Sequence, residues 1–288
     1  MMKPTVRSWR IGASLLPVSA LVALLAIQPS PAAESTVDLA LVLTTDISYS
    51  VDRDEARFQS EGTIAAFRSP EVVKAIQSGA LGRIAVAYIV FGSRGQERVL
   101  VDWKIIHDQP SAERFANALA EHPLPQGLQT SISSGIELAL RLLETSGIAA
   151  TRKVIDVSGD GPNNDGRLVV PVRDEAIAKG VTLNGLPIVT EADKFDVYYL
   201  PDLDKYYAGC VIGGPHAFIQ VAHGFEDFAR AIRRKLVLEI SESGAAPSSN
   251  PNMVKVAATV RGASPRTTPI YEKGCDIGER MRYGAGPP

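Results

Sequence analysis

Histidine, cysteine and long apolar runs are scarce in this sequence, and their scarcity limits the function classes open to it. The four histidines are scattered, and none has a cysteine or acidic partner at the spacing of zinc ligands. The Gly-x-Ser-x-Gly sequence of many serine hydrolases does not occur. Basic patches interleaved with aromatic residues are also missing, which argues against nucleic-acid binding.

The first 33 residues have the layout of a secretory signal peptide. Three basic residues precede an apolar stretch at 13–27, and small residues then allow cleavage after Ala32 or Ala33. The apolar stretch contains Pro17 and is shorter than the roughly 20 residues needed to span a bilayer. We therefore expect an exported protein, periplasmic or secreted, with no stable membrane span after cleavage. The mature chain would carry 27 Lys and Arg against 32 Asp and Glu, a mildly acidic balance.

Segments typical of buried strands then alternate with segments typical of amphipathic helices. The alternation predicts an α/β fold with a doubly wound, mostly parallel sheet flanked by helices and one antiparallel edge strand. The expected strands are one that begins at 37 and others at 83–91, 97–105, 152–158, 181–189 and 217–221, with 97–105 at the antiparallel edge. The expected helices are 52–67, 71–76 after a break at Ser69-Pro70, 111–121, 130–145, 173–179 and 225–238.

The composition changes after residue 240. Residues 241–288 are rich in Ser, Pro, Gly and Arg, which predicts a linker and a largely disordered tail behind a domain at 35–240. Cys210 and Cys275 are the only cysteines. Export permits a disulfide between them, which would close a loop of about 65 residues and stabilise the fold by about 4 kcal/mol. A buried free thiol at Cys210, before an apolar pair, is the alternative.

Three segments place carboxylates and hydroxyls beyond predicted strands or at the start of a predicted helix. The first strand runs into Asp46-Ile47-Ser48-Tyr49-Ser50, Asp160 follows strand 152–158 between two glycines, and Thr130 opens a helix. Ligands of open α/β sheets bind beyond the carboxyl ends of the strands. Carboxylate and hydroxyl oxygens suit a hard cation such as Mg²⁺. Taken singly, each feature also has a plain reading as a helix cap or a turn.

Together, the three segments resemble the metal-ion-dependent adhesion site of the von Willebrand factor type A domain family, over residues 35–240. The stretches 154–166, 185–188 and 231–240 further resemble a bacterial branch of that family with no assigned activity. The resemblance implies a bound Mg²⁺, or Mn²⁺ or Ca²⁺, whose shell is completed by a carboxylate of a partner. The ligands it implies are Ser48, Ser50 and Thr130, with Asp46 and Asp160 acting directly or through water.

Tyr49 stands where many members of the family have Gly, and it adds an aromatic ring at the edge of the site. We expect Tyr49, Asn163 and Asn164 to form a rim that a partner contacts. The tyrosine-rich segment 198–207 is either a recognition surface or a covering helix or loop.

The leading interpretation is an exported, divalent-cation-dependent binding module of the adhesion type, whose protein partner offers an acidic side chain. The first alternative is a metal-assisted hydrolase with Asp46 or Asp160 as base. Because the three segments contain no candidate second base or nucleophile, an enzyme is not expected. The second alternative is a structural assembly subunit with a vestigial metal site.

Overall fold

The computed structural model describes residues 36–190, 198–241, 253–255 and 271–284. Its centre is strand β1 (Val37–Asp46), which is buried along almost its whole length. Two parallel strands flank it, β2 (Ile84–Phe91) and β4 (Ala150–Gly159). Strands covered on both faces read as continuous apolar runs, which is why the sequence located these three. The predicted signal peptide, 1–33, lies outside the described residues.

The sheet has the order β3-β2-β1-β4-β5-β6-β8 and is mostly parallel, as predicted. Strand β3 (Arg98–Ile106) is the expected antiparallel edge strand beside β2. Strand β5 (Thr182–Val189) pairs in parallel with β4. The expected strand 217–221 is instead two short strands, β6 (Phe218–Gln220) and β7 (Ala222–His223), which pair with different parts of β5.

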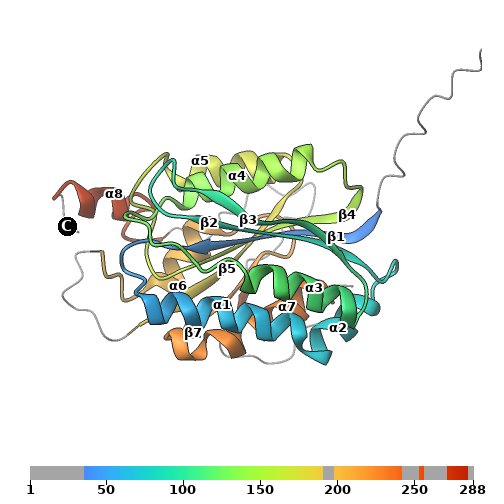
Figure 1. Cartoon of the computed structure of the whole chain (residues 1–288). Coiled ribbons are helices and arrows are strands. Elements are labelled where there is room, and N and C mark those ends of the chain that lie inside the picture. Colours follow the sequence, from blue (N-terminus) through green and yellow to red (C-terminus); the bar gives the residue numbers. More distant parts are fainter. Residues whose placement is uncertain (1–35, 191–197, 242–252, 256–270, 285–288) are drawn as a thin grey trace, which may run out of the picture. The chain divides into compact units, whose positions relative to one another are not determined.

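Helices cover both faces of the sheet (Figure 1). One face carries α1 (Arg53–Arg68), α2 (Pro70–Gln77), α3 (Gln109–Ala120) and α7 (Phe228–Ile240). The opposite face carries α4 (Ile132–Thr145) and α5 (Val169–Ala178). Short helical elements complete the set: α6 (Leu203–Tyr206), the π-helical turn η1 (Tyr207–Val211), the 3-10 turn η2 (Phe225–Asp227) and α8 (Ile277–Arg282).

Local sequence signals explain where the first helices begin and end. Asp52 caps α1, since its side chain accepts from the backbone N–H groups of Asp54 and Glu55, and the Glu55 carboxylate accepts from the Asp52 N–H in return. Ser69 ends α1 and caps α2, and Pro70 begins the second helix. The predicted break at Ser69-Pro70 is therefore present.

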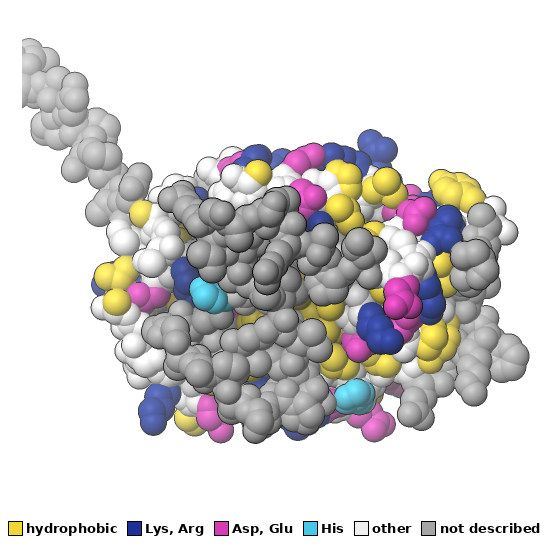
Figure 2. Space-filling view, turned by 180° about the vertical axis from the view of Figure 1, so that it is seen from behind, with side chains coloured by type: hydrophobic (Ala, Val, Ile, Leu, Met, Phe, Trp, Pro, Cys, Tyr) yellow, Lys and Arg dark blue, Asp and Glu magenta, His cyan; other side chains and the backbone are white. Residues whose placement is uncertain are grey.

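A buried ionic cluster lies beneath α7. Lys235 and Glu239 of that helix are fully buried, and Lys235 Nζ lies 2.5 Å from Asp156 Oδ2 of β4. Asn184 of β5 donates to Glu239 Oε1. On the surface, by contrast, acidic and basic side chains are interspersed over the face seen in Figure 2, in keeping with the nearly balanced charge of the chain.

Parts of the predicted linker and tail are folded. Residues Met253–Lys255 form β8, which pairs antiparallel with β6 at the edge opposite β3. Residues 271–284 contain α8 and are joined to η1 by a disulfide between Cys210 and Cys275. Residues 242–252, 256–270 and 285–288 lie outside the described part of the chain. Within that part, no helix combines the length and the apolar character needed to cross a membrane.

Candidate metal centre

The candidate site lies where β1 and β4 end side by side. Thr45 of β1 is in register with Ser158 of β4, so the residues that follow each strand emerge together at the same edge of the sheet. Asp46 is the last residue of β1, and Asp160 comes directly after β4. The parallel topology therefore brings two carboxylates together from positions more than a hundred residues apart.

Hydrogen bonds join the residues of the Asp-x-Ser-x-Ser segment to Asp160. The Ser48 backbone N–H donates to Asp46 Oδ1 at 2.8 Å. The hydroxyls of Ser48 and Ser50 lie 3.1 Å apart, and the Ser50 hydroxyl donates to Asp160 Oδ1 at 2.9 Å. The four predicted site residues of these two loops thus form one continuous polar cluster.

Thr130 reaches the same place from a third segment. Its backbone N–H donates to Asn164 Oδ1 at 2.9 Å, and its carbonyl accepts from the Asn164 N–H at 2.9 Å. A side chain at Gly161 would meet Thr130 Oγ1 at 3.6 Å, so the hydroxyl lies against the residue that follows Asp160. The cap of α4 is Ser131, whose hydroxyl accepts from the Ser134 N–H. Thr130 is therefore not the N-cap of α4.

Asp46 is the fully buried carboxylate of the cluster. Its side chain is 0% exposed, and Oδ2 has no hydrogen-bond partner among the described residues. Burial, and next the neighbouring Asp160 carboxylate, raise the pKa of Asp46 well above its usual value. A buried, unpaired anion is destabilising unless a cation or a proton compensates it. A bound cation would neutralise the buried charge of Asp46.

The donor set fits a hard divalent cation. Among the described residues, no group of three or more His, Cys, Asp or Glu side chains is placed to hold a metal ion. A cation at this site would instead rely on two carboxylates and three neutral hydroxyls, all of them oxygen donors. Ions such as Mg²⁺ accept oxygen ligands and commonly retain some bound water.

Tyr207 and Gly159 shape the floor of the site, and the sequence alone did not identify them as site residues. A side chain at Gly159 would lie 2.9 Å from both Asp46 Oδ2 and the Tyr207 hydroxyl, so only glycine fits between them. Burial and the Asp46 charge raise the pKa of Tyr207 well above its usual value. Tyr206 and Tyr207 are both fully buried, so this part of the tyrosine-rich segment covers the site from below and is not a recognition surface.

The three residues expected at the rim differ in exposure. Tyr49 is 72% exposed and lies at the surface beside the hydroxyls. Asn163 and Asn164 are 0% and 3% exposed. Their side chains bind backbone groups, Asn164 at Thr130 and Asn163 at the N–H of Ser133 in the first turn of α4. These two asparagines hold the loops of the site in place and do not face a partner.

A groove of about 620 Å³, lined by both apolar and charged side chains, lies next to the site, between α1 and the segment that follows α3. Ile47, which separates Asp46 from Ser48, contributes to its wall, so the groove begins within the site loop. Its other apolar lining includes Val51, Ala56, Ile64, Leu124 and Pro125. Leu128 is 62% exposed near it, and its carbonyl accepts from the Tyr49 N–H at 3.2 Å. The site is thus bordered by exposed apolar side chains.

Residues 36–244 match one protein-family model, described as "Protein of unknown function (DUF1194)". No curated protein matches the chain.

Solved structures show the fold. A von Willebrand factor type A structure from Catenulispora acidiphila has a TM-score of 0.52 at 12% identity, with 76% of this chain and 54% of that chain covered. Proximal thread matrix protein 1 from the mussel byssus, with a zinc-occupied MIDAS motif, has a TM-score of 0.51 at 14% identity, with 71% of this chain and 46% of that chain covered. The pilus adhesin SpaC from Lactobacillus rhamnosus GG has a TM-score of 0.51 at 14% identity, with 72% of this chain and 31% of that chain covered. This chain thus spans about half or less of these structures.

Proposed function

Since the chain belongs to the DUF1194 family of proteins of unknown function and has the von Willebrand factor type A fold, we propose that it is a divalent-cation-dependent protein-binding module. A cation would bind at the end of β1, and an acidic side chain of a protein partner would complete its coordination. One observation carries this proposal: Asp46 is a fully buried carboxylate whose Oδ2 has no hydrogen-bond partner among the described residues.

The roles of the five site residues follow from their chemistry. Ser48, Ser50 and Thr130 would coordinate the cation through neutral hydroxyls, and Asp46 and Asp160 would act directly or through water. Where the two aspartates act through water, the directly bound ligands are the three neutral hydroxyls, which leave much of the positive charge of the cation uncompensated, so an incoming carboxylate is attracted as a further ligand. Mg²⁺ is the proposed ion, with Mn²⁺ or Ca²⁺ as alternatives. A zinc-occupied MIDAS motif in the mussel protein supports the use of a divalent ion by this fold.

The apolar border of the site suggests how a partner would be held beyond its carboxylate. Tyr49 and Leu128 are exposed large side chains on two hydrogen-bonded loops. We assign the groove between α1 and the 120–126 segment to an apolar side chain that lies close in sequence to the partner's acidic residue. A protein segment with an acidic and an apolar residue satisfies both features, whereas a small free anion satisfies only the first.

Export is part of the proposal. Residues 1–33 have the sequence of a signal peptide, and the disulfide between Cys210 and Cys275 is a bond that persists in oxidising compartments such as the periplasm or the medium. The pilus adhesin and the byssus protein named above are likewise proteins of surfaces or matrices by their names.

Isothermal titration of the mature protein tests the cation site. The chelator-treated protein is titrated with Mg²⁺, Mn²⁺, Ca²⁺ and Zn²⁺, with and without acetate as a stand-in for the partner's carboxylate. We expect saturable binding that is lost in Asp46→Ala and Ser48→Ala. Thr130→Ala should bind weakly, while Thr151→Ala, a change of the same residue type at an exposed position of β4, should bind normally. Absence of binding in the wild type, with acetate present, would refute the proposal.

Binding of a partner is tested in a second step. Peptides that carry one Glu or Asp beside one Leu or Phe are compared with peptides that lack either residue, in Mg²⁺ and in chelator. The proposal requires that loss of the acid abolishes binding and that loss of the apolar residue weakens it. Equal binding of all peptides in chelator would exclude a cation-bridged contact.

A further inference from the structure

The C-terminal residues 271–284 lie against the loop that carries Asp160, although they lie beyond the family match at 36–244. We infer that this segment, the C-terminal brace, positions the candidate cation site. The inference rests on the proposed function, because it assigns Glu279 and Arg282 as positioning residues for that site. Neither residue is a ligand in this reading, since each acts through the 160–166 loop.

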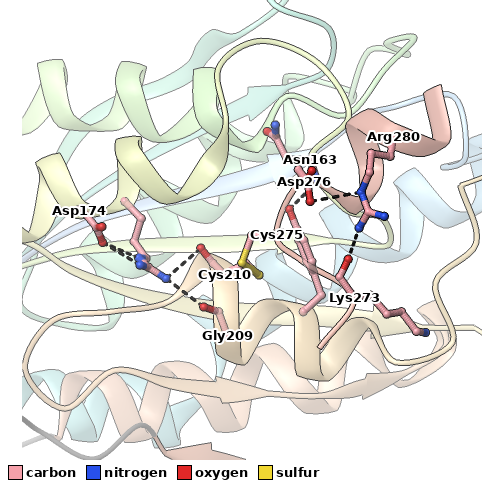
Figure 3. Close-up of a disulfide and its surroundings, with 10 residues drawn as sticks. Asn163, Asp174, Gly209, Cys210, Lys273, Cys275, Asp276 and Arg280 are labelled. Carbon is pink, nitrogen blue, oxygen red and sulfur yellow. Dashed lines mark hydrogen bonds and ion pairs between the residues drawn. A yellow bond between two sulfur atoms is a disulfide. The ribbon is translucent and has the colours of Figure 1, made fainter. Parts of the chain in front are cut away.

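The brace is fixed to the domain by covalent and apolar contacts. Figure 3 shows the disulfide between Cys210, in η1, and Cys275, two residues before α8, with Asn163 nearby. Tyr271 and Ile277 are buried in the same apolar core as α4 and α5. Lys273 Nζ lies 2.7 Å from the Asp202 carboxylate. The brace is therefore an ordered part of the fold and has a defined position against the loop.

From this position α8 contacts three successive residues of the loop. Glu279 Oε1 accepts from Asn163 Nδ2 at 2.7 Å. The Arg282 guanidinium donates to the Asn164 carbonyl at 3.1 Å and also pairs with the Asp165 carboxylate. The backbone of Gly278 packs directly on Asn163, since a Cβ at this position would clash with the Asn163 carbonyl oxygen.

The same three loop residues are held on their other side by the segment that begins at Thr130 and by the link between β2 and β3. Asn164 makes the two backbone contacts with Thr130, and Asn163 Oδ1 accepts from the Ser133 N–H at 3.0 Å. Asp165 Oδ2 accepts from the Arg94 N–H in the β2–β3 link at 2.8 Å. Asn163 and Asn164 thus lie between the brace and the segment that begins at Thr130, and Asp165 lies between the brace and the β2–β3 link. Displacement of α8 would free the loop from one side and alter the separation of Asp160 and Thr130.

Three kinds of variant remove the brace in different ways. Gly278→Ala forces α8 away from Asn163. Glu279→Ala/Arg282→Ala removes the three polar contacts of α8 with the loop and leaves the disulfide intact. Cys210→Ser/Cys275→Ser removes the tether and leaves the polar contacts intact. Glu272→Ala/Arg233→Ala is the matched control, because it removes one exposed acid of the same segment and one exposed base elsewhere.

Two measurements are made on the full mature chain: the Mg²⁺ or Mn²⁺ affinity by titration, and hydrogen exchange of the Asn164 amide, which donates to Thr130. Mutation of residues that orient metal ligands without binding the metal typically lowers metal affinity by about 10–100-fold. We expect a loss of this size in the three brace variants with faster exchange at Asn164, and wild-type values for the control. Thermal melts establish that each variant is folded at the temperature of the titration.

The outcomes separate the brace from the proposed function. Absence of cation binding in the wild type refutes the proposed function, and the inference falls with it. If the wild type binds and the folded brace variants bind equally well, the inference alone is overturned, whether or not exchange at Asn164 increases. Reduced affinity in the control variant to the same extent would also overturn it, because the effect would then not depend on contacts with the loop.

Discussion

Replacement of Asp46 by Asn should stabilise the metal-free protein while it abolishes cation binding. The wild-type carboxylate is fully buried, its Oδ2 lacks a partner among the described residues, and Asp160 raises its energy further. An amide retains an acceptor for the Ser48 N–H and removes the buried charge. An unsatisfied buried polar group costs about 1–3 kcal/mol, and more when it is charged. The variant should therefore gain at least about 1 kcal/mol in its free energy of unfolding.

The assay is a set of thermal melts of both proteins, in chelator and in saturating Mg²⁺. For a domain of this size, 1 kcal/mol corresponds to about 2–4 °C in Tm. In chelator the variant should melt higher than the wild type. Saturating cation stabilises only the protein that binds it, by about 2.7 kcal/mol at a hundred times Kd, so the order should reverse in Mg²⁺. A variant that melts lower than the wild type in chelator would refute the reasoning, because Asp46 would then be stabilising without a cation.

The pH dependence provides a second check on the same variant. The folded-state pKa of Asp46 lies above its ordinary value of 3.8, so the folded protein retains a proton that the unfolded chain releases. Ionised Asp46 therefore destabilises the metal-free fold most at high pH, and the fold gains stability as pH falls through the raised pKa towards 4. The stability difference between Asp46→Asn and the wild type should accordingly shrink as pH falls. A difference that stays constant with pH would contradict a raised pKa.

Three further changes test other parts of the structure. Lys235→Met should cost about 3–5 kcal/mol in urea unfolding, since it leaves the buried carboxylates of Asp156 and Glu239 without their cation, and a loss below about 1 kcal/mol would contradict this. Burial raises the pKa of Asp156 to about 7, so the free energy of unfolding of the wild type should fall by up to about 1.4 kcal/mol for each pH unit as pH rises from 4 to 7. Asp156→Asn should flatten that slope. Tyr49→Ala should weaken partner binding without a change in Mg²⁺ affinity, and an altered cation titration would place Tyr49 in the site itself.

The sequence predicted the sheet well because its strands are buried on both faces and carry an unmistakable apolar pattern. The sequence predicted the ends of elements less well where these depend on contacts with neighbouring elements. Helix α5 begins at Val169, four residues before the expected start, because Pro171 is tolerated in the first turn of a helix. The single strand expected at 217–221 is divided, since its two parts pair with β5 at Gly185 and at Ile188.

Prediction of the site was limited by the same dependence on tertiary contacts. The spacing of Asp46, Ser48 and Ser50 is local, so the sequence displays it directly. Asn163 and Asn164 are polar residues of the kind expected at an exposed rim. Only their contacts with Thr130 and Ser133 reveal that they are buried and hold the site loops together. The contacts of α8 join residues more than a hundred positions apart, and Cys275 was the one signal in the tail that pointed to them.

Two buried aspartates on neighbouring strands show how the molecule treats charge in different ways. Asp156, in the middle of β4, has an internal cation in Lys235, whose Nζ lies 2.5 Å away. Asp46, at the end of β1, is equally buried, yet the charges that bear on its pKa include the Asp160 carboxylate and no basic side chain. The fold can therefore compensate a buried carboxylate with a lysine where the role is structural. At Asp46 no basic side chain is among the charges that act on the carboxylate, and this difference between two similar residues is the physical reason to expect cation binding at the end of β1 and not beneath α7.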